Sequence, residues 1–262
     1  LKDFAKNFNL PFTDDDLENP TYIDLSADKK AFDYLHEQRN KLGGLIPSRK
    51  VSAEKLKISE TLLDEFSEET KRELSTTMVF VRILTKLLRD KNIGERVVPI
   101  VPDEARTFGM DSLFRQFGIY SSVGQKYEPE DADKVMFYRE SKNGMMLEEG
   151  INEAGAFSAW LALATSYSNN QLPMIPFYIY YSMFGFQRIH DLAWAAGDSR
   201  AKGFLLGATS GRTTLNGEGL QHQDGHSHIM AGTIPNCRSY DPCFSYELET
   251  IISEGIEDMY VK

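Results

Sequence analysis

"MIPFYIYYS" (residues 174–182), "FQRIHDLAWAAGDSRA" (186–201) and "GFLLGATS" (203–210) follow one another in the chain. The first and third are continuous apolar runs without polar alternation, which is typical of strands buried on both faces. The middle stretch carries its apolar residues at helical spacing, so it predicts a helix. A buried strand, a helix and a second buried strand predict a parallel sheet that helices cover.

The same alternation continues on either side of this unit. Upstream, "RVVPIVPD" (96–103) is predicted to be a strand and "INEAGAFSAWLALATSYS" (151–168) a long helix. Downstream, "TIPNCRSYDP" (233–242) is predicted to be another strand, and "SYELETIISEGIEDMY" (245–260) the closing helix. The sequence therefore predicts an α/β fold with a mostly parallel sheet and helices on both faces.

The first part of the chain has a different character. Residues 1–50 are polar and rich in turn residues, around one expected helix at 28–42. From residue 51 a helical register begins, and the stretch 68–90 predicts an amphipathic helix of several turns. Its expected apolar face consists of Leu74, Met78, Val81, Leu84 and Leu88. We expect an extension over 1–50 and one α/β domain over 51–262.

Composition and charge exclude several classes of protein. Hydrophobic residues make up 41% of the 262 residues and the formal net charge is −10, so a core can form but nucleic acid and anionic membranes are poor partners. No apolar run approaches the ~20 residues of a membrane span, and no signal peptide is visible. Two cysteines, Cys237 and Cys243, are ordinary for a reducing compartment. We expect a cytoplasmic protein, and a piece of a longer chain because the pattern opens in mid-course.

Charged and aromatic residues gather in four stretches that follow predicted strands or precede predicted helices. These stretches are "VPDEARTFGM" (101–110), "LEEGINEAG" (147–155), "YYSMFGFQR" (180–188) and "SGRTTLNGEGLQHQDGHSH" (210–228). In open parallel sheets, ligands bind beyond the carboxyl ends of the strands. We therefore expect several of these stretches to share one edge of the sheet and to form one pocket.

The last stretch raises the question of a metal. His222, His226 and His228 lie within seven positions, and imidazoles are common zinc ligands. Their spacing matches no zinc signature, and the surrounding glycines favour a shaped loop over a helix. A zinc-dependent hydrolase is thus one hypothesis, histidines that bond the loop's own backbone are another, and a non-catalytic dimerisation module is a third.

Two other features favour a binding site. Glu153 stands just inside a helix that is otherwise almost wholly apolar, so we expect it to face a partly buried site and to need a partner. Glu148 and Glu149 precede that helix, where we expect them to cap its N-terminus. Tyr181 and Phe184 follow a buried strand beside a glycine, which suits either core packing or contact with a flat heterocycle.

Several long strings of the sequence carry a resemblance. "VPDEARTFGM", "EGINEAGA", "LPMIPFYIYYSMFGFQR", "WAAGD" and "GATSGRTTLNGEGLQHQDGHSHI" together resemble the middle, pyrimidine-binding domain of the homodimeric bacterial type of pyruvate dehydrogenase decarboxylase component, a thiamine diphosphate-dependent family. The resemblance is dense over 97–260. Residues 1–50, with "YLHEQRNKLGGLIPSRK", resemble the end of the preceding domain. Gln223 and His190 depart from the family's pattern, where an acidic and a small residue are expected.

The resemblance implies a role for each matching residue. Glu153 matches the glutamate that hydrogen-bonds N1′ of the aminopyrimidine, Phe184 the aromatic that stacks on this ring, and Tyr181 and His222 the residues that face the substrate. The catalytic residues implied are Glu153, His222, Tyr181 and Glu104. The cofactor-binding residues implied are Glu153, Phe184, Asp103 and Glu218. His226 and His228 are assigned to holding their loop, so this chain is expected to supply no metal ligand.

The resemblance also implies the activity and its partners. It is the oxidative decarboxylation of pyruvate, a step linked to glycolysis, with acetyl transfer to the lipoyl group of dihydrolipoyl acetyltransferase in the pyruvate dehydrogenase complex. The family holds the diphosphate through Mg²⁺ and a "GDG" motif followed some thirty residues later by Asn; "GDS" (197–199) is the nearest string here, without that Asn. The implied chain is the aminopyrimidine half of a site shared in a homodimer, inactive alone, with the Mg²⁺ ligands outside it.

Overall fold

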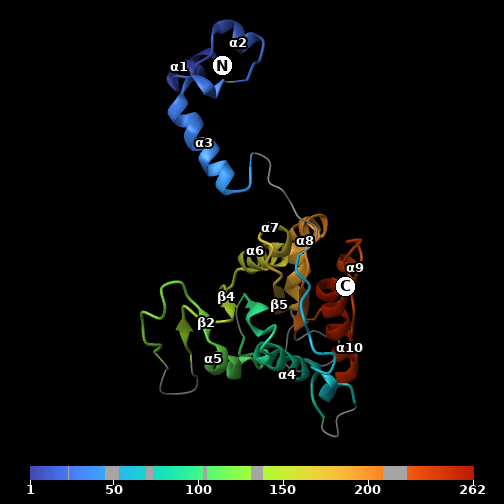
Figure 1. Cartoon of the computed structure of the whole chain (residues 1–262). Coiled ribbons are helices and arrows are strands. Elements are labelled where there is room, and N and C mark those ends of the chain that lie inside the picture. The colour runs from blue at the N-terminus through green and yellow to red at the C-terminus, as the bar shows by residue number, and fades with distance from the viewer. Residues whose placement is uncertain (23, 45–52, 69–72, 103–104, 131–137, 209–222) are drawn as a thin grey trace. The chain divides into compact units, whose positions relative to one another are not determined.

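The computed structural model describes the chain except residues 23, 45–52, 69–72, 103–104, 131–137 and 209–222. The chain divides into two compact units, Leu1–Arg49 and Lys50–Lys262 (Figure 1). The second unit is the larger and contains every strand of the described residues.

The first unit is a set of short helices: α1 (Lys2–Asn7), α2 (Asp14–Glu18), a 3-10 turn (Leu25–Ala27) and α3 (Lys29–Lys41). Local hydrogen bonds begin two of them. The Thr13 hydroxyl accepts from the backbone N–H of Asp16 at 3.2 Å, and the Asp28 carboxylate accepts from that of Ala31 at 3.0 Å. Among the described residues of this unit only Ala5 is buried, so its own core is minimal.

The second unit is built on a parallel sheet of four strands in the order β4-β1-β5-β6. The strands are β1 (Val97–Val101), β4 (Leu147–Glu148), β5 (Ile175–Tyr181) and β6 (Phe204–Ala208), and each pairs with its neighbour in parallel. The predicted fold class is therefore confirmed. Two shorter strands, β2 (Ile119–Tyr120) and β3 (Glu140–Ser141), pair beside it.

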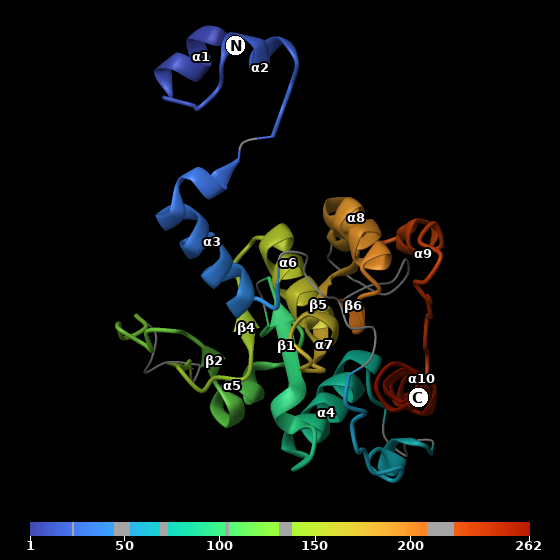
Figure 2. The same cartoon turned by 45° about the horizontal axis from the view of Figure 1, so that its top comes forward.

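Helices cover both faces of the main sheet, and β5 shows why (Figure 2). Its side chains alternate between two cores: Phe177 and Ile179 belong to one, Tyr178 and Tyr180 to the other. On the first face pack α4 (Thr76–Arg89) and α10 (Ser245–Ile256). On the second pack α6 (Glu153–Ala164) and α8 (Ser182–Asp198). A strand buried on both sides accounts for the continuous apolar run at 174–182.

The remaining elements of the second unit are short. They are α5 (Asp111–Phe117), α7 (Ser166–Asn169), α9 (Ser227–Ala231), 3-10 turns at Asp64–Phe66 and Gly94–Arg96, and a π-helical turn at Glu257–Val261. No helix in the described ranges combines the length and apolarity that crossing a membrane requires.

The two ends of this unit's chain meet. The backbone N–H of Leu56 donates to the carbonyl of Tyr260 at 3.0 Å. The Tyr260 hydroxyl donates to the carbonyl of Lys202 at 2.9 Å, and the Lys202 ammonium donates to the carbonyl of Met259 at 2.7 Å. Lys202 directly precedes β6, so these contacts lie at the edge of the sheet where the strands begin.

Two predicted features are wrong. The stretch 233–242 forms no strand: after α9 it runs through turns and coil with mostly exposed residues, and Pro235 and Pro242 cannot donate to a strand ladder. The amphipathic helix begins only at Thr76, because Ser75 caps it by accepting from the N–H of Met78 at 3.2 Å. Leu74 therefore precedes the helix, and Met78 in its first turn is 42% exposed.

Candidate functional site

The carboxyl ends of the four parallel strands define one edge of the main sheet. Here β4 leads through a short loop into α6, and β5 passes directly into α8. The chain also leaves β1 at Val101 and β6 at Ala208 on this edge. Glu153, Tyr181 and Phe184 thus come from two connections that the fold brings to the same edge (Figure 2).

Glu153 is the first residue of α6, and its position depends on the residue before it. Asn152 caps the helix, because its side-chain oxygen accepts from the backbone N–H of Gly155 at 3.0 Å. The expectation that Glu148 and Glu149 cap this helix is wrong, since Glu148 belongs to β4 and pairs beside Val101. The side chain of Glu153 is only 15% exposed, at a helix end that favours a negative charge.

Arg188 joins Glu153 to the aromatic residues of α8. Its Nη1 forms an ion pair with Oε1 of Glu153, and its guanidinium carbon lies 4.5 Å from the centre of the Phe184 ring. Phe184 and Arg188 are four positions apart on α8, so they lie on the same side of the helix. The Phe184 ring in turn meets Tyr181, with ring centres 6.4 Å apart and planes at 67°.

Tyr178 adds a buried polar group near this cluster. Its hydroxyl is buried and has no hydrogen-bond partner among the described residues. Burial raises the pKa of Tyr178 well above its usual range, and the charge of Glu153 raises it further, while Arg188 acts in the opposite sense. A buried hydroxyl without a partner is uncommon, and it marks a place where a polar ligand atom would be favoured.

The described histidines of the 222–228 stretch connect segments of protein. The ring Nε2 of His226 lies 2.5 Å from the side-chain amide nitrogen of Gln187, and Nδ1 of His228 bonds the Ser239 hydroxyl. The Asp224 carboxylate accepts from two backbone N–H groups of this loop. Burial alone would raise the pKa of Asp224, but these hydrogen bonds outweigh it and the pKa is lowered. Within the described ranges no group of three or more His, Cys, Asp or Glu side chains could hold a metal ion.

A family model described as "Pyruvate dehydrogenase E1 component middle domain" matches residues 59–262. The chain belongs to the pyruvate dehydrogenase E1 component family. The resemblance drawn from its motif strings is confirmed, and the comparisons give no support to a zinc hydrolase or to a non-catalytic dimerisation module.

Curated relatives with the same description extend the match to the first unit. The chain is 59% identical over 261 residues to the pyruvate dehydrogenase E1 component of Pseudomonas aeruginosa, which covers 99% of this chain. It is 58% identical over 264 residues to that of Escherichia coli K12 and 57% identical over 265 residues to that of Cupriavidus necator, covering 99% and 100% of this chain. The chain spans 30% of the length of each of these E1 components.

The structure places some of the expected E1 site residues and leaves others out. It brings Glu153, Tyr181 and Phe184 to one edge and adds Arg188, which sequence reasoning missed. The only sequence signal for Arg188 is its spacing of four from Phe184. Four expected site residues lie outside the described residues: Asp103, Glu104, Glu218 and His222.

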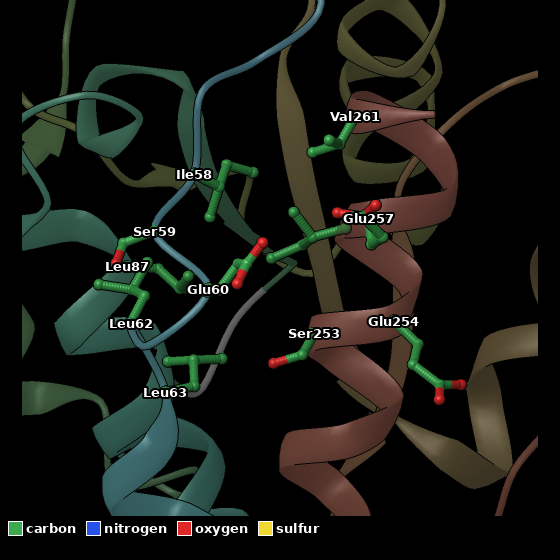
Figure 3. A pocket seen from close by; sticks show the side chains of 11 residues that line it. Ile58, Ser59, Glu60, Leu62, Leu63, Leu87, Ser253, Glu254, Glu257 and Val261 are labelled. Atoms are coloured by element: carbon green, nitrogen blue, oxygen red, sulfur yellow. The ribbon is translucent and has the colours of Figure 1, made fainter.

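A cavity of about 250 Å³ lies elsewhere in this E1 domain, between the segment 58–63 and α10 (Figure 3). Ile58 and Leu63 line one side and Ile256 the other. Leu63 and Ile256 belong to the core on the α4 and α10 face, whereas α6 and α8 cover the opposite face. This cavity is therefore separate from the cluster around Glu153.

Proposed function

We propose that this chain supplies the aminopyrimidine half of a shared thiamine diphosphate site in a pyruvate dehydrogenase E1 component. The proposed activity is the oxidative decarboxylation of pyruvate with acetyl transfer to the lipoyl group of dihydrolipoyl acetyltransferase. One observation carries the proposal: a largely buried carboxylate, Glu153, and an aromatic ring, Phe184, reach the same sheet edge from separate elements. Membership of the E1 family supports the choice of cofactor and substrate.

The residues present fit an aminopyrimidine ring. Such a ring is flat and carries hydrogen-bonding nitrogens, so it needs an apolar face and buried polar partners. Phe184 offers the face, Glu153 a carboxylate, and Tyr178 a buried hydroxyl without a partner among the described residues. When bound, thiamine diphosphate supplies the electron sink that decarboxylation of a 2-keto acid requires.

The chain's own side chains then have separate tasks. Glu153 holds the proton that it exchanges with the ring nitrogen N1′, as a general acid–base group must. Tyr181 and His222 bind and orient pyruvate on the substrate side. Glu104 acts with them, and Asp103 and Glu218 complete the cofactor-binding edge. His226 and His228 hold the loop in place, consistent with their bonds to Gln187 and Ser239.

We also propose how the site is divided between chains. Residues 51–262 form the pyrimidine-binding domain, and residues 1–50 the end of the preceding domain, which is supported by the near absence of buried residues in the described part of Leu1–Arg49. Another domain of the longer protein, contributed by the second subunit of a cytoplasmic homodimer, holds the diphosphate and Mg²⁺. The sequence of this chain lacks the "GDG" motif that would do so.

Residues 1–262 alone are therefore expected to bind thiamine diphosphate very weakly. Contacts to Glu153 and Phe184 would supply about 2–4 kcal/mol, taking a charged hydrogen bond and an aromatic stack at their usual size. Against the entropy lost on association, this corresponds to millimolar affinity at best. Titration calorimetry with and without Mg²⁺ measures it. Micromolar, Mg²⁺-dependent binding would place a complete site in this chain and contradict the division.

His222→Ala in the full-length enzyme is expected to affect pyruvate far more than the cofactor. Loss of one hydrogen bond to a charged substrate group corresponds to a fall of roughly 10- to 100-fold in kcat/KM for pyruvate, with a change of at most about 2-fold in the Kd of thiamine diphosphate. His226→Ala is the matched comparison, and its effect is expected in thermal stability, because it removes the contact to Gln187. A large change in cofactor Kd with normal pyruvate kinetics would refute the role given to His222.

A further inference from the structure

The guanidinium of Arg188 makes two contacts at once. It is ion-paired with the carboxylate of Glu153 and lies over the ring of Phe184, with its central carbon 4.5 Å from the ring centre. These are the two side chains to which the proposed function assigns the aminopyrimidine ring. A guanidinium is also planar, donates hydrogen bonds in its plane and stacks on aromatic faces. In chemical terms it resembles the ring that the same two side chains would bind.

We propose that Arg188 and the aminopyrimidine of thiamine diphosphate compete for Glu153 and Phe184. This inference rests on the proposed function of the site. Arg188 neutralises a carboxylate that is only 15% exposed, so that Glu153 is not left as a buried charge without a partner. When the pyrimidine binds, it takes over the hydrogen bond to Glu153 and the face of Phe184, and the guanidinium leaves both.

The structure gives the Arg188 side chain somewhere to go. It is 46% exposed, so its path to solvent is open without movement of α8. Asp191 lies three positions further along the same helix and is exposed, and side chains at this spacing are neighbours on a helix surface. The guanidinium can therefore exchange one carboxylate for another by a change of rotamer.

The size of the competition follows from this exposure. An ion pair with one half-exposed partner and a cation–π contact at the surface are both weak, and both would be given up on binding. Removing the competitor should tighten cofactor binding by about 3- to 10-fold. A residue that only positions Glu153 for the pyrimidine would instead weaken binding when removed.

The test is titration calorimetry of thiamine diphosphate with Mg²⁺ on the full-length E1 enzyme. Arg188→Met is expected to lower the Kd by about 3- to 10-fold. Arg188→Lys keeps the charge but not the planar stack, so its Kd should lie between those of Arg188→Met and the unaltered enzyme. Arg82→Met is the matched control, because Arg82 lies over the Phe66 ring at 5.4 Å on the other face of the sheet; its Kd should not change. An unchanged or higher Kd for Arg188→Met would overturn the competition.

A second arm separates this inference from the proposed function. In the Glu153→Gln background the ion pair is absent, so Arg188→Met should then change the Kd by less than about 2-fold. A full effect in that background would show that Glu153 is not what they compete for, which also overturns the inference. Turnover of Glu153→Gln alone tests the proposed function: normal turnover would sink that function, whereas low turnover with no effect of Arg188→Met on the Kd would sink only the competition.

Discussion

Replacing Glu153 by Gln in the full-length enzyme is expected to lower the turnover of pyruvate by at least ~100-fold, because general acid–base catalysis by one side chain contributes about 10²- to 10⁴-fold. Glutamine has the same shape and can still hydrogen-bond a ring nitrogen, but it cannot hold and return the proton. The fold should survive. The only printed side-chain contact that is lost is the ion pair with Arg188, whose side chain is 46% exposed, and such pairs contribute about 1 kcal/mol or less.

The measurement combines thiamine-dependent decarboxylation of pyruvate with a circular dichroism melt on the same preparation. Glu149→Gln is the matched control, since Glu149 is an exposed glutamate of the same β4–α6 connection. Its turnover should stay within about 2-fold of the unaltered enzyme, as expected for a surface change. Near-normal turnover of Glu153→Gln would remove Glu153 from the mechanism.

Gly185→Ala is expected to lower the free energy of unfolding of the chain by about 2 kcal/mol, the usual size of an overpacking effect after the gain in helix propensity is subtracted. Gly185 is buried in the first turns of α8, and a Cβ placed on it would overlap the ring of Tyr180. That ring cannot easily move, because Tyr180 is 4% exposed in the core under α6 and α8. The start of α8 must shift instead, and with it Phe184.

Denaturant unfolding followed by tryptophan fluorescence reports this loss, because both tryptophans, Trp160 and Trp194, lie in α6 and α8. Gly232→Ala is the control: its Cβ would meet no atom closer than the His228 carbonyl at 3.2 Å, so its unfolding free energy should change by about 0.5 kcal/mol or less. If Gly185→Ala unfolds at the same denaturant concentration as the unaltered chain, the contact between α8 and Tyr180 does not fix the helix.

Much of the fold was predictable because β5 is buried on both sides. A strand of this kind must be apolar throughout, so its sequence declares a parallel sheet between layers of helix. By contrast, β4 was missed because it has only two residues, too few for any periodicity, and its pairing with β1 depends on the rest of the sheet. The false strand at 233–242 shows the reverse, apolar letters that have no neighbouring strand to pair with.

The site was predictable to the extent that it follows from topology. Strand ends of a parallel sheet share an edge, so the approach of Glu153 to Tyr181 and Phe184 was expected before any coordinates. The partner of Glu153 was not, because Arg188 is 35 residues away and reaches it only through the packing of α6 against α8. Local sequence cannot report such a tertiary pair. It misled at Glu148 and Glu149 for a related reason, since charge near a helix start suggests a cap that Asn152 in fact provides.

The contact between Leu56 and Tyr260 has a consequence for how this domain is joined to its neighbours. The backbone enters and leaves the α/β unit side by side, next to Lys202 at the edge where the strands begin. Covalent connections to the rest of a longer polypeptide therefore reach the unit at a single place, while the edge with Glu153 and Phe184 is at the far end of the strands. A pull or a rotation applied through the linkers acts on that one corner and does not run along the strands. The domain can thus be carried as a rigid cassette, and its functional edge is left for association with another surface.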